Sequence, residues 1–292
     1  MKNLCTILFC LFVVNSTFAV ERWAIVVGIG DYPADSGWKN KINGDNDIEI
    51  IVPMLHRLEF RQENIITLKN KSATKRNIKE AVYKTIIPKL HNGDIVYFHF
   101  SGHGQQVTDL DGDEEDGWDE AMIPYDAKFS YDVNGYRGEN HIVDDELNGW
   151  LHDIRKRVGV RGKILVVLDA CHSGGGSREA DDTDAAPARG TDERFRITQN
   201  ANNHETHPKR EINWICISAC QSGQNNHEYQ ANNGKKYGRL SWCLSKTLTA
   251  DTLVNELETA IMRQYQLLPP MPFPQTVHME EIPTYLSNQT VL

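Results

Sequence analysis

Residues 94–104 read DIVYFHFSGHG and residues 163–174 read KILVVLDACHSG, and these two stretches decide the fold. Each begins with a continuous apolar run, which is typical of a strand covered on both faces in a parallel sheet. Each run ends at small residues and glycines, which allow the backbone to turn sharply. The sequence therefore predicts two buried parallel strands, each followed by a tight turn that carries polar side chains.

Strand and helix signals alternate outward from these stretches. The predicted strands are residues 23–29, 64–68, 94–100, 163–169 and 212–217. The predicted helices are residues 47–60, 74–90, 144–157, 240–248 and 252–267. This alternation predicts an α/β fold, a sandwich with a largely parallel central sheet and helices on both faces.

The first 19 residues have the features of a signal peptide. Lys2 precedes an apolar run at residues 4–14, and Thr17 and Ala19 supply the small side chains that a signal peptidase reads. The run is too short for a permanent membrane anchor. We therefore expect cleavage after Ala19 and an exported protein, periplasmic or secreted.

The distribution of charge limits the partners of this chain. Of its 292 residues 24% are charged, as in ordinary globular proteins, and the formal net charge is -9. Much of the acidity lies in residues 109–120, which contain no basic residue. A nucleic acid would need a basic face, so no nucleic-acid partner is expected. The acidic stretch instead suits cations, including metal ions.

Four cysteines remain after removal of the signal peptide, too few for a disulfide framework in a chain of this length. Export permits disulfides, and we expect at most one pair among Cys216, Cys220 and Cys243, which the sequence leaves undecided. The fourth, Cys171, differs from them because it lies two residues after the end of a predicted strand.

Cys171 and His103 form the candidate catalytic pair. Both lie just past the carboxyl ends of predicted parallel strands, where ligands bind in open sheets. A thiolate attacks a carbonyl carbon, and a nearby imidazole can accept the thiol proton and later protonate the leaving amine. His172 adjoins Cys171 and is expected to face elsewhere, and no ligand spacing supports a zinc site. The alternative for Cys171 alone is a structural buried thiol.

Strand geometry adds further groups to this edge. Side chains alternate along a strand, so Ser101 should point with His103 and Asp169 with Cys171. The backbone N–H groups of Gly104 and Cys171 are the candidate oxyanion donors. The site is therefore expected to hold a thiol, an imidazole, a hydroxyl and a carboxylate.

These motifs resemble those of metacaspases. Residues 97–106, followed by the acidic stretch at 109–120, are similar to the histidine region of that family, and residues 168–174 are similar to its cysteine region. The resemblance runs from about residue 22 to 177 and resumes weakly from 212 to about 248. It implies a caspase-like fold, a Cys/His dyad, and protein or peptide substrates cleaved after Arg or Lys.

The chain is accordingly expected to divide into three parts after the signal peptide. Residues 20–176 correspond to the large catalytic region and residues 212–292 to the small region, while residues 177–211 form a polar linker without an apolar period. The bases of the linker include Arg178, Arg189, Arg194 and Arg196. A peptidase with an acidic pocket could cut its own chain there.

By resemblance, the substrate's basic side chain would be bound by Asp47, Ser101 and Asp169. A buried guanidinium or ammonium needs carboxylate partners, so this assignment is physically consistent. The spacing from Cys171 independently places Asp169 at the same edge. The alternative role for Asp47 is that of a helix N-cap.

The resemblance also implies activation by Ca²⁺, and Asp119, Asp144 and Asp145 are similar to the family's ligand positions. Residues 109–120 carry the alternating aspartates of an EF-hand loop, but Glu114 stands where that loop needs glycine. The family's further acidic ligand after the cysteine has no clear counterpart. The alternative is a solvated acidic loop.

Two other functions fit part of the pattern. A clostripain- or gingipain-like peptidase of the same clan also prefers basic residues, but the acidic stretch favours the metacaspase side. A catalytically inactive, calcium-responsive binding domain is the non-enzyme alternative. The four polar groups at the strand ends are all present, which argues against an inactive domain.

Overall fold

The computed structural model describes residues 19–39, 41–171, 188–198, 213–221, 223–271, 275–280 and 282–292. The predicted signal peptide lies outside the described residues except for Ala19. Of the predicted linker, only residues 188–198 are described.

A six-stranded sheet forms the centre of the molecule. Its strands are β1 (Arg22–Gly28), β2 (Ile65–Lys69), β3 (Ile95–Ser101), β7 (Lys163–Asp169), β8 (Ile215–Ser218) and β11 (His278–Met279), in the order β11-β8-β7-β3-β1-β2. Neighbouring strands are parallel, except that β11 runs antiparallel to β8. The expected α/β fold with a largely parallel central sheet is therefore confirmed.

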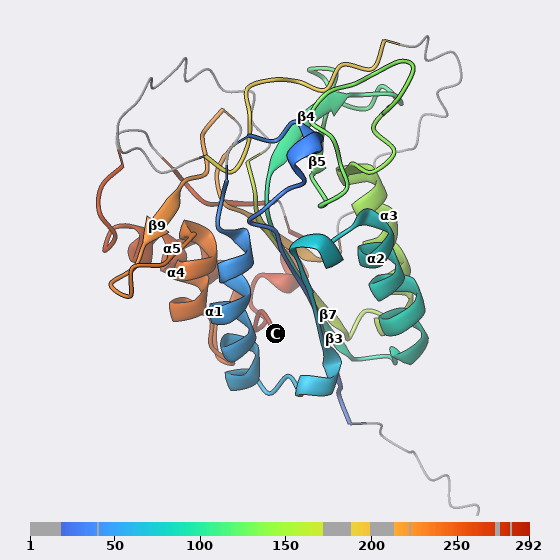
Figure 1. The fold of residues 1–292 in the computed structure, drawn as a ribbon. Helices are drawn as coiled ribbons and strands as arrows, with labels where there is room; N and C mark the ends of the chain where they lie inside the picture. Colours follow the sequence, from blue (N-terminus) through green and yellow to red (C-terminus); the bar gives the residue numbers. More distant parts are fainter. Residues whose placement is uncertain are drawn as a thin grey trace, which may run out of the picture.

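Helices cover both faces of this sheet. They are α1 (Gly44–Arg57), α2 (Lys75–Glu80), α3 (Asp144–Val158), α4 (Arg239–Thr247) and α5 (Val254–Tyr265). Helices α2 and α3 lie on one side of β3 and β7, and α1, α4 and α5 lie on the other (Figure 1). Among the described residues, no helix has the length and apolar character needed to cross a bilayer.

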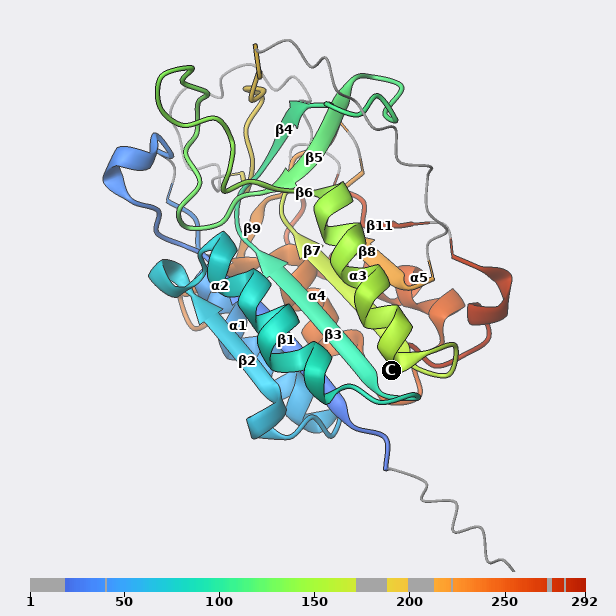
Figure 2. The ribbon, with the colours of Figure 1, turned by 90° about the vertical axis from the view of Figure 1, so that its right-hand side faces the viewer.

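The two covered faces explain the continuous apolar runs. Along β3, Val96 and Phe98 pack in the core beside α2 and α3, whereas Tyr97 packs in the core on the opposite face. Figure 2 shows α2 and α3 in front of the sheet and α1 and α4 behind it. Each such buried side chain stabilises the fold by roughly 1.5–3 kcal/mol.

The helix predicted at 74–90 has the expected start and an irregular end. Thr74 caps α2, because its Oγ1 accepts a hydrogen bond from the N–H of Asn77 at 3.2 Å. The chain then continues as a π-helical turn, Ala81–Ile86, and a 3₁₀ turn, Ile87–Lys89. Further 3₁₀ turns are Ala34–Ser36, Gln62–Asn64, Asn70–Ser72 and Thr284–Leu286.

Two small antiparallel sheets were not predicted. One contains β4 (Gly104–Thr108), β5 (Trp118–Met122) and β6 (Ile142–Val143), in the order β4-β5-β6. The other contains β9 (Glu228–Gln230) and β10 (Lys236–Gly238). The β4–β5 hairpin stands over the carboxyl ends of β3 and β7 (Figures 1 and 2). Because β4 begins directly after His103, this hairpin borders the candidate site.

Candidate active site

The carboxyl ends of β3 and β7 hold the candidate catalytic residues. Ser101 and Asp169 end these strands and pair directly in the sheet. His103 and Cys171 each follow two residues later. The N–H of Gly102 donates to the carbonyl oxygen of Asp169 at 3.4 Å, which joins the two turns. The parallel register therefore brings both segments to one edge.

The imidazole of His103 is held by aromatic packing. Its ring stacks on Trp38, with ring centroids 4.6 Å apart and planes inclined by 16°. Its backbone N–H donates to Tyr32 Oη at 3.0 Å, and Tyr32 Oη donates to the carbonyl oxygen of Ile123 at 2.9 Å. Burial raises the pKa of Tyr32, so its hydroxyl keeps the proton that it donates. These contacts fix the plane of the ring at the sheet edge.

The thiol of Cys171 is buried beside a second thiol. Its Sγ donates to the carbonyl oxygen of Gln224 at 3.2 Å. A hydrogen bond with Cys171, together with burial, raises the pKa of the Cys220 thiol, so Cys220 stays neutral. Cys216, Cys220 and Cys243, whose pairing the sequence left undecided, are free thiols.

The two backbone N–H groups predicted as oxyanion donors both donate to the backbone of Arg189. Its carbonyl oxygen accepts the N–H of Cys171 at 2.8 Å and the N–H of Gly104 at 3.2 Å. Its own N–H donates to the carbonyl oxygen of Asn226 at 2.9 Å. A Cβ on Gly190 would lie 2.6 Å from the Cβ of Cys171, so the residue after Arg189 passes directly against the candidate nucleophile.

The side chain of Arg189 fills an acidic pocket and is 0% exposed. Its Nη1 donates to Asp47 Oδ2 and to Ser101 Oγ, both at 2.6 Å, and lies 3.4 Å from Asp169 Oδ1. Its Nε and Nη2 donate to Glu228 Oε1 at 3.2 and 3.1 Å. The three residues predicted to bind a basic side chain thus contact one buried guanidinium, and Glu228 adds a third carboxylate.

Asp169 is held in its ionised form. Its Oδ1 accepts from Asn226 Nδ2 at 2.7 Å, and its Oδ2 accepts from the N–H and the Oγ of Ser241 at 2.7 and 2.6 Å. Burial alone would raise the pKa of Asp169, but Arg189 and these hydrogen bonds outweigh it and lower the pKa.

Asp47 contacts the same guanidinium nitrogen of Arg189 as Asp169 does. Its Oδ1 accepts the N–H of Gly238 at 2.9 Å, and its Oδ2 accepts a hydrogen bond from Ser101. Burial raises the pKa of Asp47 to about 6, although Arg189 opposes the shift. A Cβ on Gly238 would lie 2.1 Å from Asp169 Oδ2 and 2.5 Å from Arg189 Nη1, so the pocket requires glycine there.

A family model described as the caspase domain matches residues 21–291. The chain belongs to the caspase-domain family. Metacaspase-1B from Aspergillus fumigatus is 37% identical over 163 residues, which cover 53% of this chain and 36% of that protein. Metacaspase-1 from Pyricularia oryzae is 30% identical over 160 residues, which cover 53% of this chain and 37% of that protein. The resemblance to metacaspases is therefore confirmed, over little more than a third of the relatives' length.

Solved structures support the caspase-like fold. The crystal structure of a protein from Geobacter sulfurreducens matches with a TM-score of 0.63 at 22% identity, covering 93% of this chain and 99% of that one. The crystal structure of caspase-1 from Spodoptera frugiperda matches with a TM-score of 0.57 at 12% identity, covering 92% of each chain. At these identities the likeness establishes the fold of this caspase-domain chain, and the chemistry must be argued from its own residues.

Several pocket residues of this caspase-domain chain were not predicted. Glu228, Asn226, Gly238 and Ser241 all come from the small region, around β9, β10 and the start of α4. The position of a polar residue at the end of a long apolar strand identified Asp169, but β9 and β10 contain only three residues each and give no such signal. The N-cap alternative for Asp47 is wrong, because α1 starts earlier, after Asn43.

The other histidine of the β3 motif has a structural environment. Nδ1 of His99 lies 3.0 Å from Tyr97 Oη, and Nε2 lies 3.2 Å from Ser241 Oγ. Burial lowers the pKa of His99 to about 4, so the ring stays neutral in the core at physiological pH. His172 lies outside the described residues.

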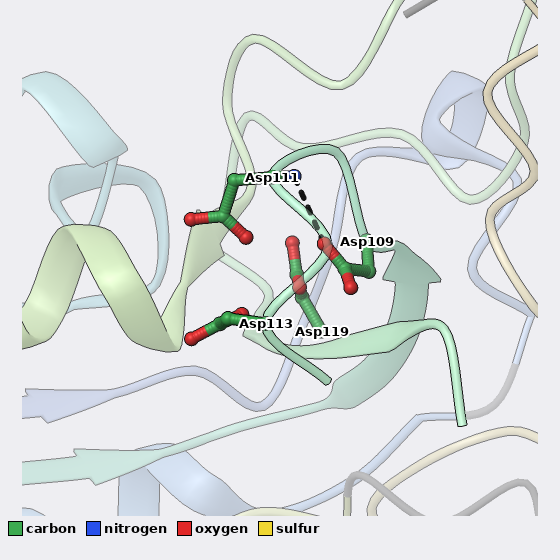
Figure 3. Close-up of side chains that lie close together, drawn as sticks. All are labelled: Asp109, Asp111, Asp113 and Asp119. Atoms are coloured by element: carbon green, nitrogen blue, oxygen red, sulfur yellow. Dashed lines mark hydrogen bonds between the residues drawn. The ribbon is translucent and has the colours of Figure 1, made fainter. Parts of the chain in front are cut away.

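Four carboxylates, three from the loop between β4 and β5 and one from the start of β5, lie close together (Figure 3). One oxygen from each of Asp109, Asp111, Asp113 and Asp119 lies within 4.8 Å of the others. Asp109 accepts the N–H of Asp111 at 2.9 Å, which folds the loop back on itself. One oxygen of Asp111 and one of Asp119 are buried without a hydrogen-bond partner in the described structure.

This cluster fits a hard cation. Burial and the charges of Asp144, Asp109 and Asp145 raise the pKa of Asp119 to about 8. Burial and Asp145 likewise raise the pKa of Asp144 to about 7. The buried oxygens of Asp111 and Asp119 that lack donors suit Ca²⁺, which takes oxygen ligands.

The cluster overlaps the predicted calcium ligands only in part. Asp119 belongs to it, whereas Asp144 and Asp145 begin α3 and act on Asp119 through their charge. The alternating aspartates supply the other members. They lie in a loop between antiparallel strands, so the arrangement is not the helix-flanked loop of an EF-hand.

Proposed function

We propose that this protein is a cysteine endopeptidase that hydrolyses peptide bonds after Arg or Lys, with Cys171 as the nucleophile and His103 as the general base. The observation that carries the proposal is the double position of Arg189. Its guanidinium is buried among carboxylates, and its carbonyl oxygen accepts the N–H groups of Gly104 and Cys171. A purely structural arginine would need only the first of these contacts. The combination is that of a peptide bound as a substrate.

The proposed reaction has two halves. His103 accepts the thiol proton while Sγ of Cys171 attacks the carbonyl carbon, and the oxyanion is stabilised by the N–H groups of Gly104 and Cys171. The protonated imidazole then gives its proton to the leaving amine, which releases the downstream peptide and leaves a thioester. Water hydrolyses the thioester, which yields a new carboxyl terminus and restores the thiol.

The pocket supports a preference for positive charge. Three buried carboxylates surround one cation. An empty pocket, or a neutral side chain in it, would leave their negative charges without a counter-charge. The guanidinium of Arg189 donates to Asp47 through Nη1 and to Glu228 through Nε and Nη2, and the one nitrogen of an ammonium group cannot occupy these separate donor positions. Arg should therefore be preferred to Lys, and Asp or Asn should be rejected.

The first substrate in this proposal is the chain itself, cut between Arg189 and Gly190. Gly190 suits the position after the cleaved bond because a side chain there would meet Cys171. The linker bases Arg194 and Arg196 lie over the ring of Trp118 instead, with Cζ 4.5 and 5.2 Å from its centroid. Arg178 lies outside the described residues.

Calcium binding is a second part of the proposal. Asp109, Asp111, Asp113 and Asp119 would hold the ion, and its charge would offset their mutual repulsion. Because β4 starts at Gly104, next to His103, a more rigid hairpin would steady one oxyanion donor. The alternative of a solvated acidic loop predicts no effect of calcium.

We also propose that the protein is exported after cleavage behind Ala19. Sequencing of the mature N-terminus tests this.

The test is hydrolysis of four short peptides that share Ala-Pro-Ala, followed by Arg, Lys, Asp or Asn and a fluorogenic reporter. The protein is assayed with millimolar calcium and with a chelator, beside its Cys171→Ala variant. We expect hydrolysis after Arg and Lys only, stimulated by calcium and absent from the variant. Hydrolysis after Asp, or equal hydrolysis by Cys171→Ala, would contradict the proposal. No hydrolysis by the native chain would favour the inactive binding domain.

A further inference from the structure

The segment after Arg189 pairs with the edge of the hairpin through an isolated β-bridge at Phe195. The N–H of Phe195 donates to the carbonyl oxygen of Gln106 at 2.8 Å, and the N–H of Thr108 donates to the carbonyl oxygen of Phe195 at 3.1 Å. Phe195 pairs with Val107 in parallel, and β4 is an edge strand of its sheet. Addition of an extended segment to a sheet edge is a common mode of peptide binding.

An aromatic pocket receives the side chain of Phe195, which is 1% exposed. Its ring meets Tyr131 and Tyr136 edge-on, with centroids 6.0 and 5.9 Å away and interplanar angles of 82° and 81°. The ring of His141 lies 4.4 Å away. A Cβ on Gly138 would come within 3.0 Å of the Phe195 ring, so this glycine leaves room for it. The pocket therefore matches a flat aromatic side chain.

Basic side chains flank this anchor. Arg194 and Arg196 lie on the same Trp118 ring, and Arg194 Nε also donates to Gln106 Oε1 at 2.8 Å. Trp118 begins β5, directly after the acidic loop. A basic–aromatic–basic sequence is therefore recognised by stacking and by hydrogen bonding together.

We propose that the outer edge of β4, with the pocket of Tyr131, Tyr136 and His141, is a second substrate-recognition site. It binds an aromatic residue six positions after the basic residue that enters the acidic pocket, in a peptide with basic residues beside the aromatic one. The chain's own segment from Arg189 to Phe195 already joins the two sites. The inference rests on the proposed function, because only a cut after Arg189 makes this segment a substrate.

Anchoring at the second site brings the cleaved bond to Cys171 at a high effective concentration. A substrate with the aromatic residue should therefore bind more tightly, with little change in the chemical step. The competing explanation is that Phe195 is only a core residue of the hairpin. The two explanations differ for a peptide added from outside.

The test uses two peptides that copy residues 185–198, one native and one with Phe195→Ala. They are compared on the full-length Phe195→Ala protein, in which the second site is vacant. We expect the native peptide to be cut with a kcat/KM about tenfold higher than the substituted peptide, mainly through KM. In the native protein the difference should be smaller, because its own Phe195 competes. Equal efficiencies on the Phe195→Ala protein would overturn the inference.

Two controls make the outcome decisive. A Phe195→Leu protein is assayed in parallel, in case the alanine variant does not fold. Its ratio of kcat/KM for the native peptide to kcat/KM for the substituted peptide should lie between the ratios of the native and Phe195→Ala proteins. A ratio of one would overturn the inference. The short Ala-Pro-Ala-Arg reporter substrate reaches only the acidic pocket and Cys171, so it measures hydrolysis without the second site. If the native protein does not hydrolyse this short substrate, the proposed function is refuted and this inference with it. Normal hydrolysis with equal peptide efficiencies would refute the second site only.

Discussion

Replacement of Asp47 by Asn tests the acidic pocket with a minimal change of shape. Asp47 Oδ2 accepts from Nη1 of the seated arginine at 2.6 Å, and the side chain is 0% exposed. An amide in its place removes one negative charge and can turn an N–H towards the guanidinium. Truncating one partner of a buried, hydrogen-bonded charge pair costs about 2–5 kcal/mol. The kcat/KM for an Arg substrate should therefore fall roughly 30-fold to several-thousand-fold.

The assay is the initial rate of hydrolysis of the Arg reporter peptide, with thermal melting to verify folding. Glu49→Gln is the matched control, because Glu49 lies on the same helix, is 44% exposed and pairs with Lys235 at the surface. It should keep kcat/KM within about twofold, since exposed ion pairs contribute little. An Asp47→Asn protein that melts normally and stays within threefold of the native rate would refute the assignment of the pocket.

Four further outcomes follow. Because burial raises the pKa of Asp47 to about 6, a proton neutralises it below that pH, and KM for the Arg substrate should rise as the pH falls from 7 to 5; a constant KM would contradict this. Gly238→Ala keeps an allowed backbone (φ -61, ψ 138) but places a Cβ 2.5 Å from Nη1, so kcat/KM should drop at least about tenfold, and a native value would show that the pocket lies elsewhere. Millimolar calcium should raise the melting temperature by a few degrees in the native protein and not in Asp119→Asn, whereas equal shifts would remove the cation site from the loop. The Arg reporter should be cut about tenfold faster than the Lys reporter, and a reversed order would contradict the forked contacts to Asp47 and Glu228.

The sequence could predict those parts of the site that depend on strand geometry. Strand alternation predicted that Ser101 and Asp169 lie at the carboxyl edge of the sheet, and the parallel register fixes them side by side. Their role in binding a basic side chain, like that of Asp47, came from the resemblance to metacaspases. The positions of His103 and Cys171 follow from the same strand geometry. The strands could be predicted because the sheet is covered on both faces, so that each strand is a continuous apolar run in the sequence.

The hairpin and the linker could not be predicted in this way. Gln105 is buried in β4, but its amide is satisfied by the carbonyl oxygens of Phe129 and Glu193, contacts that depend on distant loops. The linker has no apolar period, yet Phe195 is buried against Tyr131 and Tyr136, from the segment between β5 and β6. Glu228 likewise reaches the pocket only through tertiary packing. The local sequence pattern does not predict these tertiary contacts.

Mass spectrometry of the purified protein tests the central claim most directly. With calcium present, the native chain should yield one fragment that ends at Arg189 and one that begins at Gly190, and the Cys171→Ala chain should stay intact. The same two fragments from Cys171→Ala, or a native chain cut elsewhere with the Arg189–Gly190 bond intact, would contradict the claim that this linker is bound as a substrate.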